Sequence, residues 1–134
     1  MPIKLSSSAL VDKLLLALGS GRVRSFRNNV GIAEFRNGSK VAYGLGPGSS
    51  DVVGVLSVTV TPEMVGQRVG IWFAFECKTG KGVLTYAQRA FLETMRGLGA
   101  IAAEVRAVED GVDALRSFCD RNRIPTDNDR TRFR

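Results

Sequence analysis

The chain has 134 residues, of which 44% are hydrophobic and 24% charged, as expected for one soluble domain without a run long enough to cross a membrane. It contains no histidine, which excludes Ser-His-Asp triads, Cys-His pairs and histidine metal sites. Its formal net charge of +6 favours a polyanionic partner, or else serves only solubility.

Patterns of apolar residues predict three helices and six strands. Apolar residues at every third or fourth position indicate helices, and alternating or β-branched runs indicate strands. In chain order, we expect a helix over residues 8–18, strands over 22–27, 32–35, 40–45, 52–60 and 68–76, a helix over 85–98, a strand over 101–108 and a helix over 110–119.

The segment 68–108 reads as a strand, a crossover helix and a second strand, so its two strands are expected to be parallel. The continuous apolar run at 71–75 is typical of a strand buried on both faces. We therefore expect an α/β domain over residues 1–120, followed by a basic, flexible tail over 121–134.

Cys77 and Cys119 are the only cysteines. Two cysteines without CxxC spacing indicate neither a disulfide framework nor a zinc site, and they favour a reduced, intracellular setting. The first residues lack the apolar stretch of a secretory signal, so none is expected.

Two carboxylates can face each other across an expected hairpin. Nine residues, 52–60, precede the connection and nine, 68–76, follow it, so antiparallel pairing would place Asp51 nearly opposite Glu76. Carboxylates at such a distance repel each other unless a cation lies between them, and Mg²⁺ or Mn²⁺ suits oxygen ligands. This arrangement predicts a divalent metal site.

Lys78 shares a strand face with Glu76, because residues two apart point the same way. It could orient or deprotonate a water molecule, or neutralise charge on a phosphate. Cys77 is expected to point to the opposite face, into the core, while its backbone carbonyl could bind the metal. The alternative is a surface turn at Asp51 and an exposed ion pair between Glu76 and Lys78.

Several other polar residues have two interpretations. Gln88 either closes a capping box with Thr85 at a helix start or belongs to the site, and both can hold at once. A basic group either contacts DNA phosphates or forms a solvated strand face. Its members are Arg22, Arg24, Arg27, Asn28 and Asn29. Lys81 and Arg89, which flank the loop after Glu76, are weaker candidates for DNA binding.

The chain resembles the PD-(D/E)XK nuclease superfamily and, within it, the VRR-NUC domain. The matching segments are Arg-Asn-Asn at 27–29 with Gly31, Gly-Pro-Gly-Ser-Ser-Asp at 46–51, Phe-Glu-Cys-Lys at 75–78, and Thr-Tyr-Ala-Gln at 85–88 followed by Gly99-Ala100. They follow the family's order over residues 8–118. The resemblance implies a restriction-endonuclease-like core, a mixed sheet flanked by helices in the order α-β-β-β-α-β-α.

The resemblance also implies roles for individual residues. Asp51 and Glu76 would bind Mg²⁺ or Mn²⁺, Lys78 would be the catalytic lysine, and Gln88 would be an active-site residue. The family often carries a glutamate in its first helix near the metal. This chain offers only Asp12 there, which is one carbon shorter and is either a weak ligand or a surface residue.

The implied activity is hydrolysis of DNA phosphodiesters by metal-activated water. By resemblance, the protein would be a homodimeric endonuclease of DNA repair that cuts branched DNA, including four-way Holliday junctions, in a prokaryotic or virus-infected cell. One alternative is a nucleic-acid-binding module without catalysis. Another is a different enzyme or a structural subunit on the same fold.

Overall fold

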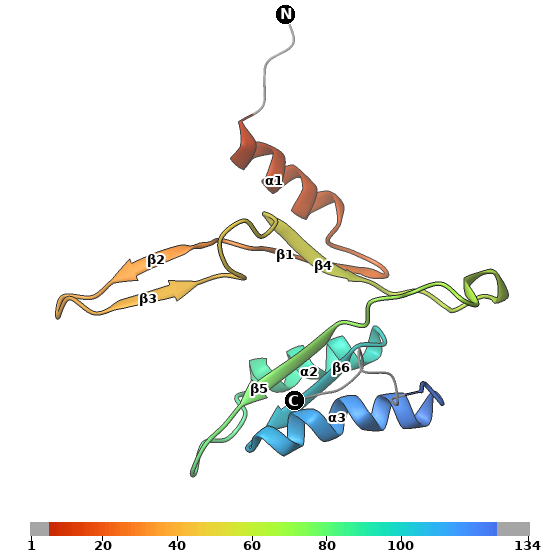
Figure 1. Ribbon diagram of the computed structural model, residues 1–134. Helices are drawn as coiled ribbons and strands as arrows, with labels where there is room; N and C mark the ends of the chain where they lie inside the picture. The colour runs from red at the N-terminus through yellow and green to blue at the C-terminus, as the bar shows by residue number, and fades with distance from the viewer. Residues whose placement is uncertain (1–5, 126–134) are drawn as a thin grey trace, which may run out of the picture. The chain divides into compact units, whose positions relative to one another are not determined.

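The structure is a computed structural model that describes residues 6–125. The chain divides into two compact units, Met1–Thr59 and Val60–Arg134, and each is described by itself. The three helices and several short strands confirm a mixed α/β chain (Figure 1). Most of the expected tail, residues 126–134, lies outside the described residues.

The first unit contains one helix and an antiparallel strand pair. Helix α1 (Ser7–Ala17) begins after Ser6, whose side chain accepts a hydrogen bond from the backbone N–H of Ala9 at 3.2 Å. Strand β1 (Val23–Arg27) pairs with β4 (Val52–Leu56). The register brings Asp51 next to the end of β1, where its carbonyl accepts the backbone N–H of the residue after Arg27 at 2.8 Å.

A second hairpin of the first unit joins β2 (Gly31–Glu34) to β3 (Lys40–Tyr43). Its turn is closed by the Asn37 side chain, which accepts hydrogen bonds from the N–H and hydroxyl of Ser39. Gly38 supplies the left-handed residue of this turn at φ 84°. The turn thus joins the two segments, 32–35 and 40–45, that were expected to be strands.

The second unit is a β-α-β-α arrangement. Strand β5 (Phe73–Cys77) pairs in parallel with β6 (Ile101–Val105), and α2 (Tyr86–Gly97) forms the crossover between them. Helix α3 (Val108–Arg121) follows β6. The predicted parallel crossover unit is confirmed. A 3₁₀ turn, η1 (Pro62–Met64), lies upstream of β5.

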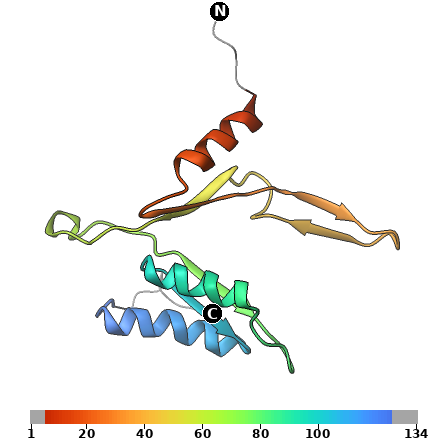
Figure 2. The ribbon, with the colours of Figure 1, turned by 180° about the vertical axis from the view of Figure 1, so that it is seen from behind.

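Helices α2 and α3 lie on opposite faces of the β5–β6 pair. Glu76 accepts a hydrogen bond from Gln88 of α2, whereas a Cβ added at Gly111 of α3 would lie 3.3 Å from the ring of Phe75. Since neighbouring strand residues point to opposite faces, each helix covers one face. Figure 2, viewed from behind, brings α2 to the front of the pair.

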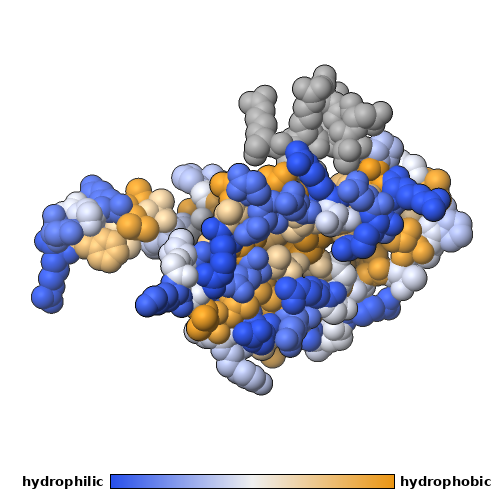
Figure 3. Space-filling view, turned by 90° about the horizontal axis from the view of Figure 1, so that it is seen from below, coloured by the Kyte–Doolittle hydropathy of each residue, from blue (hydrophilic) through white to orange (hydrophobic). Residues whose placement is uncertain are grey.

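Few side chains are fully buried, and each unit has its own small set. Val11 and Val55 are buried in the first unit. In the second unit the buried hydrophobic residues are Leu92, Met95, Ala102 and Val105. Hydrophobic surface is visible among the hydrophilic side chains in Figure 3. Each unit thus has its own small hydrophobic core.

Two expected strands are shorter than the sequence suggested because their partners are short. Strand β4 ends at Leu56, rather than at 60, where its partner β1 begins. Strand β5 begins at Phe73, rather than at 68, opposite the start of β6. All pairings recorded over residues 6–125 join β1 to β4, β2 to β3 and β5 to β6, so the expected hairpin of 52–60 with 68–76 is not among them.

The expectation that the run 71–75 is buried on both faces is wrong. Ile71 and Phe73 are 41% and 53% exposed, because a pair of two strands is too narrow to enclose every residue of the run. Phe73 instead packs its ring against Phe75, with centroids 5.3 Å apart.

Five strands precede α2, where the expected nuclease core has three, and two of them form the separate β2–β3 hairpin. Over residues 6–125, no helix is both long and apolar enough to cross a membrane.

Leu92→Ala should lower the free energy of unfolding of the second unit by about 2–5 kcal/mol, because Leu92 is only 3% exposed and its truncation leaves a cavity. Urea denaturation followed by the fluorescence of Trp72, the single tryptophan, measures this loss. Val83→Ala, at a side chain that is 73% exposed, is the control and should change stability by less than about 0.5 kcal/mol. Equal effects of the two variants would contradict the core described for this unit.

Candidate functional site

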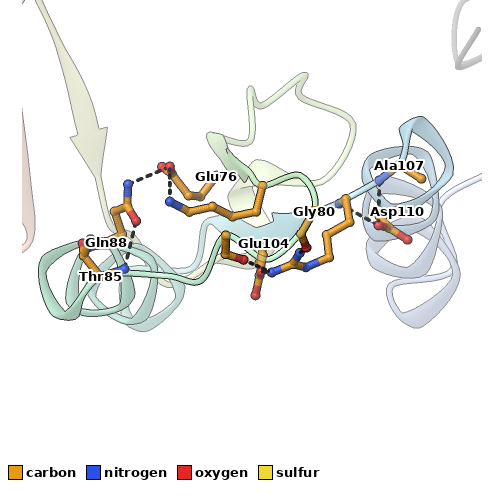
Figure 4. A network of polar contacts seen from close by, with 10 residues as sticks. Glu76, Gly80, Thr85, Gln88, Glu104, Ala107 and Asp110 are labelled. Atoms are coloured by element: carbon orange, nitrogen blue, oxygen red, sulfur yellow. Dashed lines mark hydrogen bonds and ion pairs between the residues drawn. The ribbon is translucent and has the colours of Figure 1, made fainter.

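Three of the predicted site residues meet in the second unit. The side-chain amide of Gln88 donates a hydrogen bond to Oε1 of Glu76 at 2.8 Å. The ammonium group of Lys78 lies 3.8 Å from the same oxygen. Figure 4 shows the Gln88 side chain, from the start of α2, directed at this carboxylate. The sequence motif Glu-x-Lys therefore forms a local ion pair to which Gln88 is added.

Gln88 closes the capping box that the sequence allowed and also contacts Glu76, while its role in catalysis stays a prediction. Its side-chain oxygen accepts the backbone N–H of Thr85 at 3.0 Å, and its own N–H donates to the Thr85 hydroxyl at 3.1 Å. This is a complete capping box at the start of α2. Because the oxygen serves the cap and the NH₂ group serves Glu76, one side chain fixes the helix start and the carboxylate together.

The Glu76–Lys78 pair is partly withdrawn from solvent. The Lys78 side chain is 17% exposed and that of Glu76 is 34% exposed. Partial burial strengthens the attraction between the charges and reduces screening by salt. The alternative of a fully exposed surface pair is therefore wrong for Lys78.

Sequence reasoning missed a second charged pair beside this one. Glu104 of β6 is the register partner of Glu76, so the two side chains share a face of the strand pair. Arg106 forms an ion pair with Glu104 at 2.7 Å. A usable signal was present, because Glu104-x-Arg106 repeats the spacing of Glu76-x-Lys78 on a strand predicted to be parallel.

Other predicted residues gather in the first unit. Asp51 lines a pocket of about 200 Å³ together with Arg27, Asn28 and Asn29. Ser7, Ser8 and Val11 of α1 complete its wall. The sequence motifs at 27–29 and at 46–51 are therefore adjacent in space. Glu76, Lys78 and Gln88 belong to the other unit, so convergence of Asp51 and Glu76 on one ion stays a prediction.

Asn28 builds the loop that carries Asp51. Its amide donates to the hydroxyl of Ser49 at 2.8 Å and to the carbonyl of Ser50 at 2.9 Å, and its oxygen accepts the N–H of Leu45 at 3.0 Å. Asn28 is buried, at 9% exposure, and these bonds satisfy its polar atoms. The structure thus gives Asn28 a loop-organising role, and its predicted contact with DNA remains a prediction.

The predicted metal ligand Asp12 is paired with Arg27, a predicted DNA contact. Asp12 remains well exposed in this pair, at 68%. The Arg24 guanidinium donates to the carbonyls of Gly21 and Val23 beside it. Asn29 is exposed, and so are the remaining basic candidates, Arg22, Lys81 and Arg89.

The prediction that Cys77 points into the core is wrong, because this residue is exposed. It does lie on the face opposite Glu76, as strand alternation predicts. There it lines an open, apolar pocket of about 370 Å³ together with Phe75, Val105 and the first turns of α3. The first turns of α3 therefore leave a gap over this end of the strand pair.

Within residues 6–125, no three cysteine or carboxylate side chains lie close enough together to hold a metal ion. The predicted ligand set consists of the Asp51 and Glu76 carboxylates, the Cys77 carbonyl and, as a weak ligand, Asp12. No protein-family model, curated protein or solved structure matches the chain. The nuclease resemblance therefore depends on the sequence motifs.

Asn28→Ala should loosen the 45–51 loop, because the N–H of Leu45 and the Ser50 carbonyl lose their partner. We expect a stability loss of about 1–3 kcal/mol, as for other groups left without a hydrogen bond. Hydrogen exchange at the Leu45 amide should accelerate accordingly. The matched control is the exposed neighbour Asn29→Ala, which should leave this amide protected. Unchanged exchange in Asn28→Ala would contradict the loop-organising role.

A double-mutant cycle tests the two roles of Gln88. Thr85→Ala should cost about 1 kcal/mol through loss of the cap and should not couple to Glu76→Ala. Gln88→Ala should couple to Glu76→Ala by about 0.5–1.5 kcal/mol, because it also removes the hydrogen bond to the carboxylate. Urea denaturation of the three single variants and the two double variants measures the coupling. Zero coupling between positions 76 and 88 would refute the contact.

Proposed function

We propose that this protein is an endodeoxyribonuclease, dependent on Mg²⁺ or Mn²⁺, that hydrolyses phosphodiesters of branched DNA such as four-way junctions. The observation that carries the proposal is the convergence of Lys78 and Gln88 on Glu76, in a chain whose motif order resembles VRR-NUC nucleases.

The oxygen atoms available as ligands are of the type that a hard divalent cation binds. Within the described part of the chain, the recorded side-chain contacts of Glu76 all involve Oε1, which leaves Oε2 for an ion. Asp51 adds an exposed carboxylate, and the Cys77 carbonyl adds a neutral oxygen. Asp12 would have to leave Arg27 to contribute, so it is at most a weak ligand.

When bound, Mg²⁺ or Mn²⁺ would supply an acidified water and a counter-charge for the leaving oxygen. The residues of the chain have three tasks around it. Gln88 holds the Glu76 carboxylate in one orientation by its hydrogen bond. Lys78 places a positive charge next to that carboxylate, where it can orient the attacking water or neutralise charge on the phosphate. Asp51 provides the second negative charge that the cation requires.

DNA would be held mainly through its phosphates. The net charge of +6 gives attraction that does not depend on base sequence. Arg22, Lys81 and Arg89 are exposed and available for phosphate contacts. Arg27 would exchange Asp12 for a phosphate, and Asn29 lies beside it in the same pocket. Such contacts recognise backbone shape, which suits a branched substrate better than a particular sequence.

Helix α1 supports the proposal of a homodimer. Leu10 and Leu14 of α1 and its C-cap residue Leu18 are spaced four residues apart, and they are 50%, 40% and 40% exposed. Apolar residues with this spacing form a stripe that a second helix can cover. A two-fold dimer would also present two sites to the symmetric arms of a four-way junction.

A non-catalytic DNA-binding module is the second candidate. The observation that favours it is the Asp12–Arg27 ion pair, which occupies the carboxylate where the resembled family often has a metal ligand. Metal-dependent cleavage separates the two candidates, since a binding module would retain junction affinity without cutting.

Asp51→Asn, Glu76→Gln and Lys78→Met should each reduce cleavage of a labelled four-way junction by at least about 100-fold in Mg²⁺ or Mn²⁺, because each removes a charge from the reacting centre. The matched controls are Asp113→Asn, Glu93→Gln and Lys40→Met, which lie outside the proposed site at exposed positions and should cut normally. Gel assays on linear, flapped and four-way DNA provide the rates.

If the wild-type protein cuts none of these substrates, or if Asp51→Asn cuts as well as wild type, the nuclease proposal fails. Mn²⁺ titration by calorimetry tests the ligands without DNA. Binding should be lost in both Asp51→Asn and Glu76→Gln, and retention in either variant would remove that residue from the metal site.

A further inference from the structure

We propose that Arg106, oriented by Glu104, is a positioning residue that fixes Lys78 through the loop 79–82. Its importance for cleavage depends on the proposed nuclease function, but the positioning itself does not. Every residue involved belongs to the second unit, and Figure 4 shows the network in which they lie.

The Arg106 guanidinium binds the loop and the sheet at once. Nη1 donates to the carbonyl of Gly80 at 3.1 Å, and Nη2 donates to the carbonyl of Gly82. Nη2 also donates to Oε1 of Glu104 at 2.7 Å. The loop that follows Lys78 is therefore attached to the neighbouring strand by one side chain.

The attached loop folds back onto the Lys78 side chain. The N–H of Gly82 donates to the carbonyl of Thr79 at 3.0 Å, which closes a tight turn. Gly80 has φ 54°, a left-handed conformation that favours glycine. A Cβ at Gly82 would lie 3.7 Å from Cδ of Lys78, so the backbone at this glycine borders the lysine stem. Holding Gly82 in place therefore confines Lys78 next to Glu76.

The base of Arg106 is itself rigid. Its backbone N–H and that of Ala107 both donate to the Asp110 carboxylate, at 2.8 and 3.0 Å. This carboxylate lies in the first turn of α3, where the helix dipole also favours a negative charge. The arginine thus extends from a fixed junction between β6 and α3, and its planar fork can reach two carbonyls at defined positions.

Glu104 makes the charge of Arg106 necessary. Glu104 and Glu76 are register partners on one face, and Lys78 is the cation beside Glu76. With Arg106 in place, each carboxylate has its own cation. Without it, Glu104 would compete with Glu76 for Lys78. The loosened loop and this competition would both draw Lys78 away from Glu76.

Competitive acetylation tests the position of Lys78 without DNA or metal. In Arg106→Gln, mass spectrometry should show Lys78 labelled several-fold faster than in wild type, relative to exposed Lys40 as an internal reference. The matched control Arg116→Gln removes the same charge from an exposed position of α3 and should not change the ratio. Arg106→Lys should fail to restore it, because an ammonium group cannot span both carbonyls.

Hydrogen exchange at Leu92 and Met95 verifies that α2 stays folded in each variant. If Arg106→Gln loses this protection, Glu104→Gln is used as the test variant in its place. The Glu104→Gln substitution keeps the shape of the side chain and weakens only its interaction with Arg106. An unchanged labelling ratio in a folded variant, or an equal rise in Arg116→Gln, overturns the positioning role.

Cleavage kinetics supply the second measurement. Arg106→Gln should lower kcat for the junction by about 10- to 100-fold, as for other misplaced catalytic groups, with KM unchanged. A raised KM with normal kcat would mean that Arg106 binds DNA instead, which overturns the proposal. If the wild type does not cut, the nuclease function fails while the labelling ratio still decides the position of Lys78.

Discussion

Five residue pairs, from Phe73↔Ile101 to Cys77↔Val105, hold β5 and β6 in a parallel register on which the rest of the second unit depends. A parallel pair requires a crossover, and α2 provides it. The register also brings the Glu-x-Lys of one strand beside the Glu-x-Arg of the next. A shift of β5 by one residue would turn Glu76 and Lys78 to the face where α3 packs. The same hydrogen bonds thus specify the fold and the local electrostatics.

The face of the β5–β6 pair that carries Glu76 and Glu104 is held by both local and long-range hydrogen bonds. Thr85 and Gln88 close the start of α2 by bonds within one helical turn. The loop 79–82, by contrast, obtains its order from Arg106, far along the chain. Capping needs only contacts within the helix, whereas the order of the loop depends on the pairing of β6 with β5. The surroundings of Lys78 therefore depend on a contact between distant parts of the chain.

Local chemistry explains which elements could be predicted from the sequence. The helix 85–98 was predicted within one residue of its observed ends, because a capping box is a signal contained in four residues. Strand lengths were overestimated, since a β-branched run such as 52–60 shows propensity but not the length of its partner. The contact of Gln88 with Glu76 joins two residues of the predicted site, whose function stays a prediction. Arg106 was missed because its partners are backbone carbonyls, which have no signature in the sequence.

The exposure of Cys77 has a practical consequence. Its thiol lies on the strand between Glu76 and Lys78 but opens onto the other face, within an apolar recess. A fluorophore or nitroxide attached there would be placed one residue from both charged groups without occupying their side of the sheet. The chain therefore carries a native attachment point for a spectroscopic reporter, and Cys119, the other thiol, is less accessible.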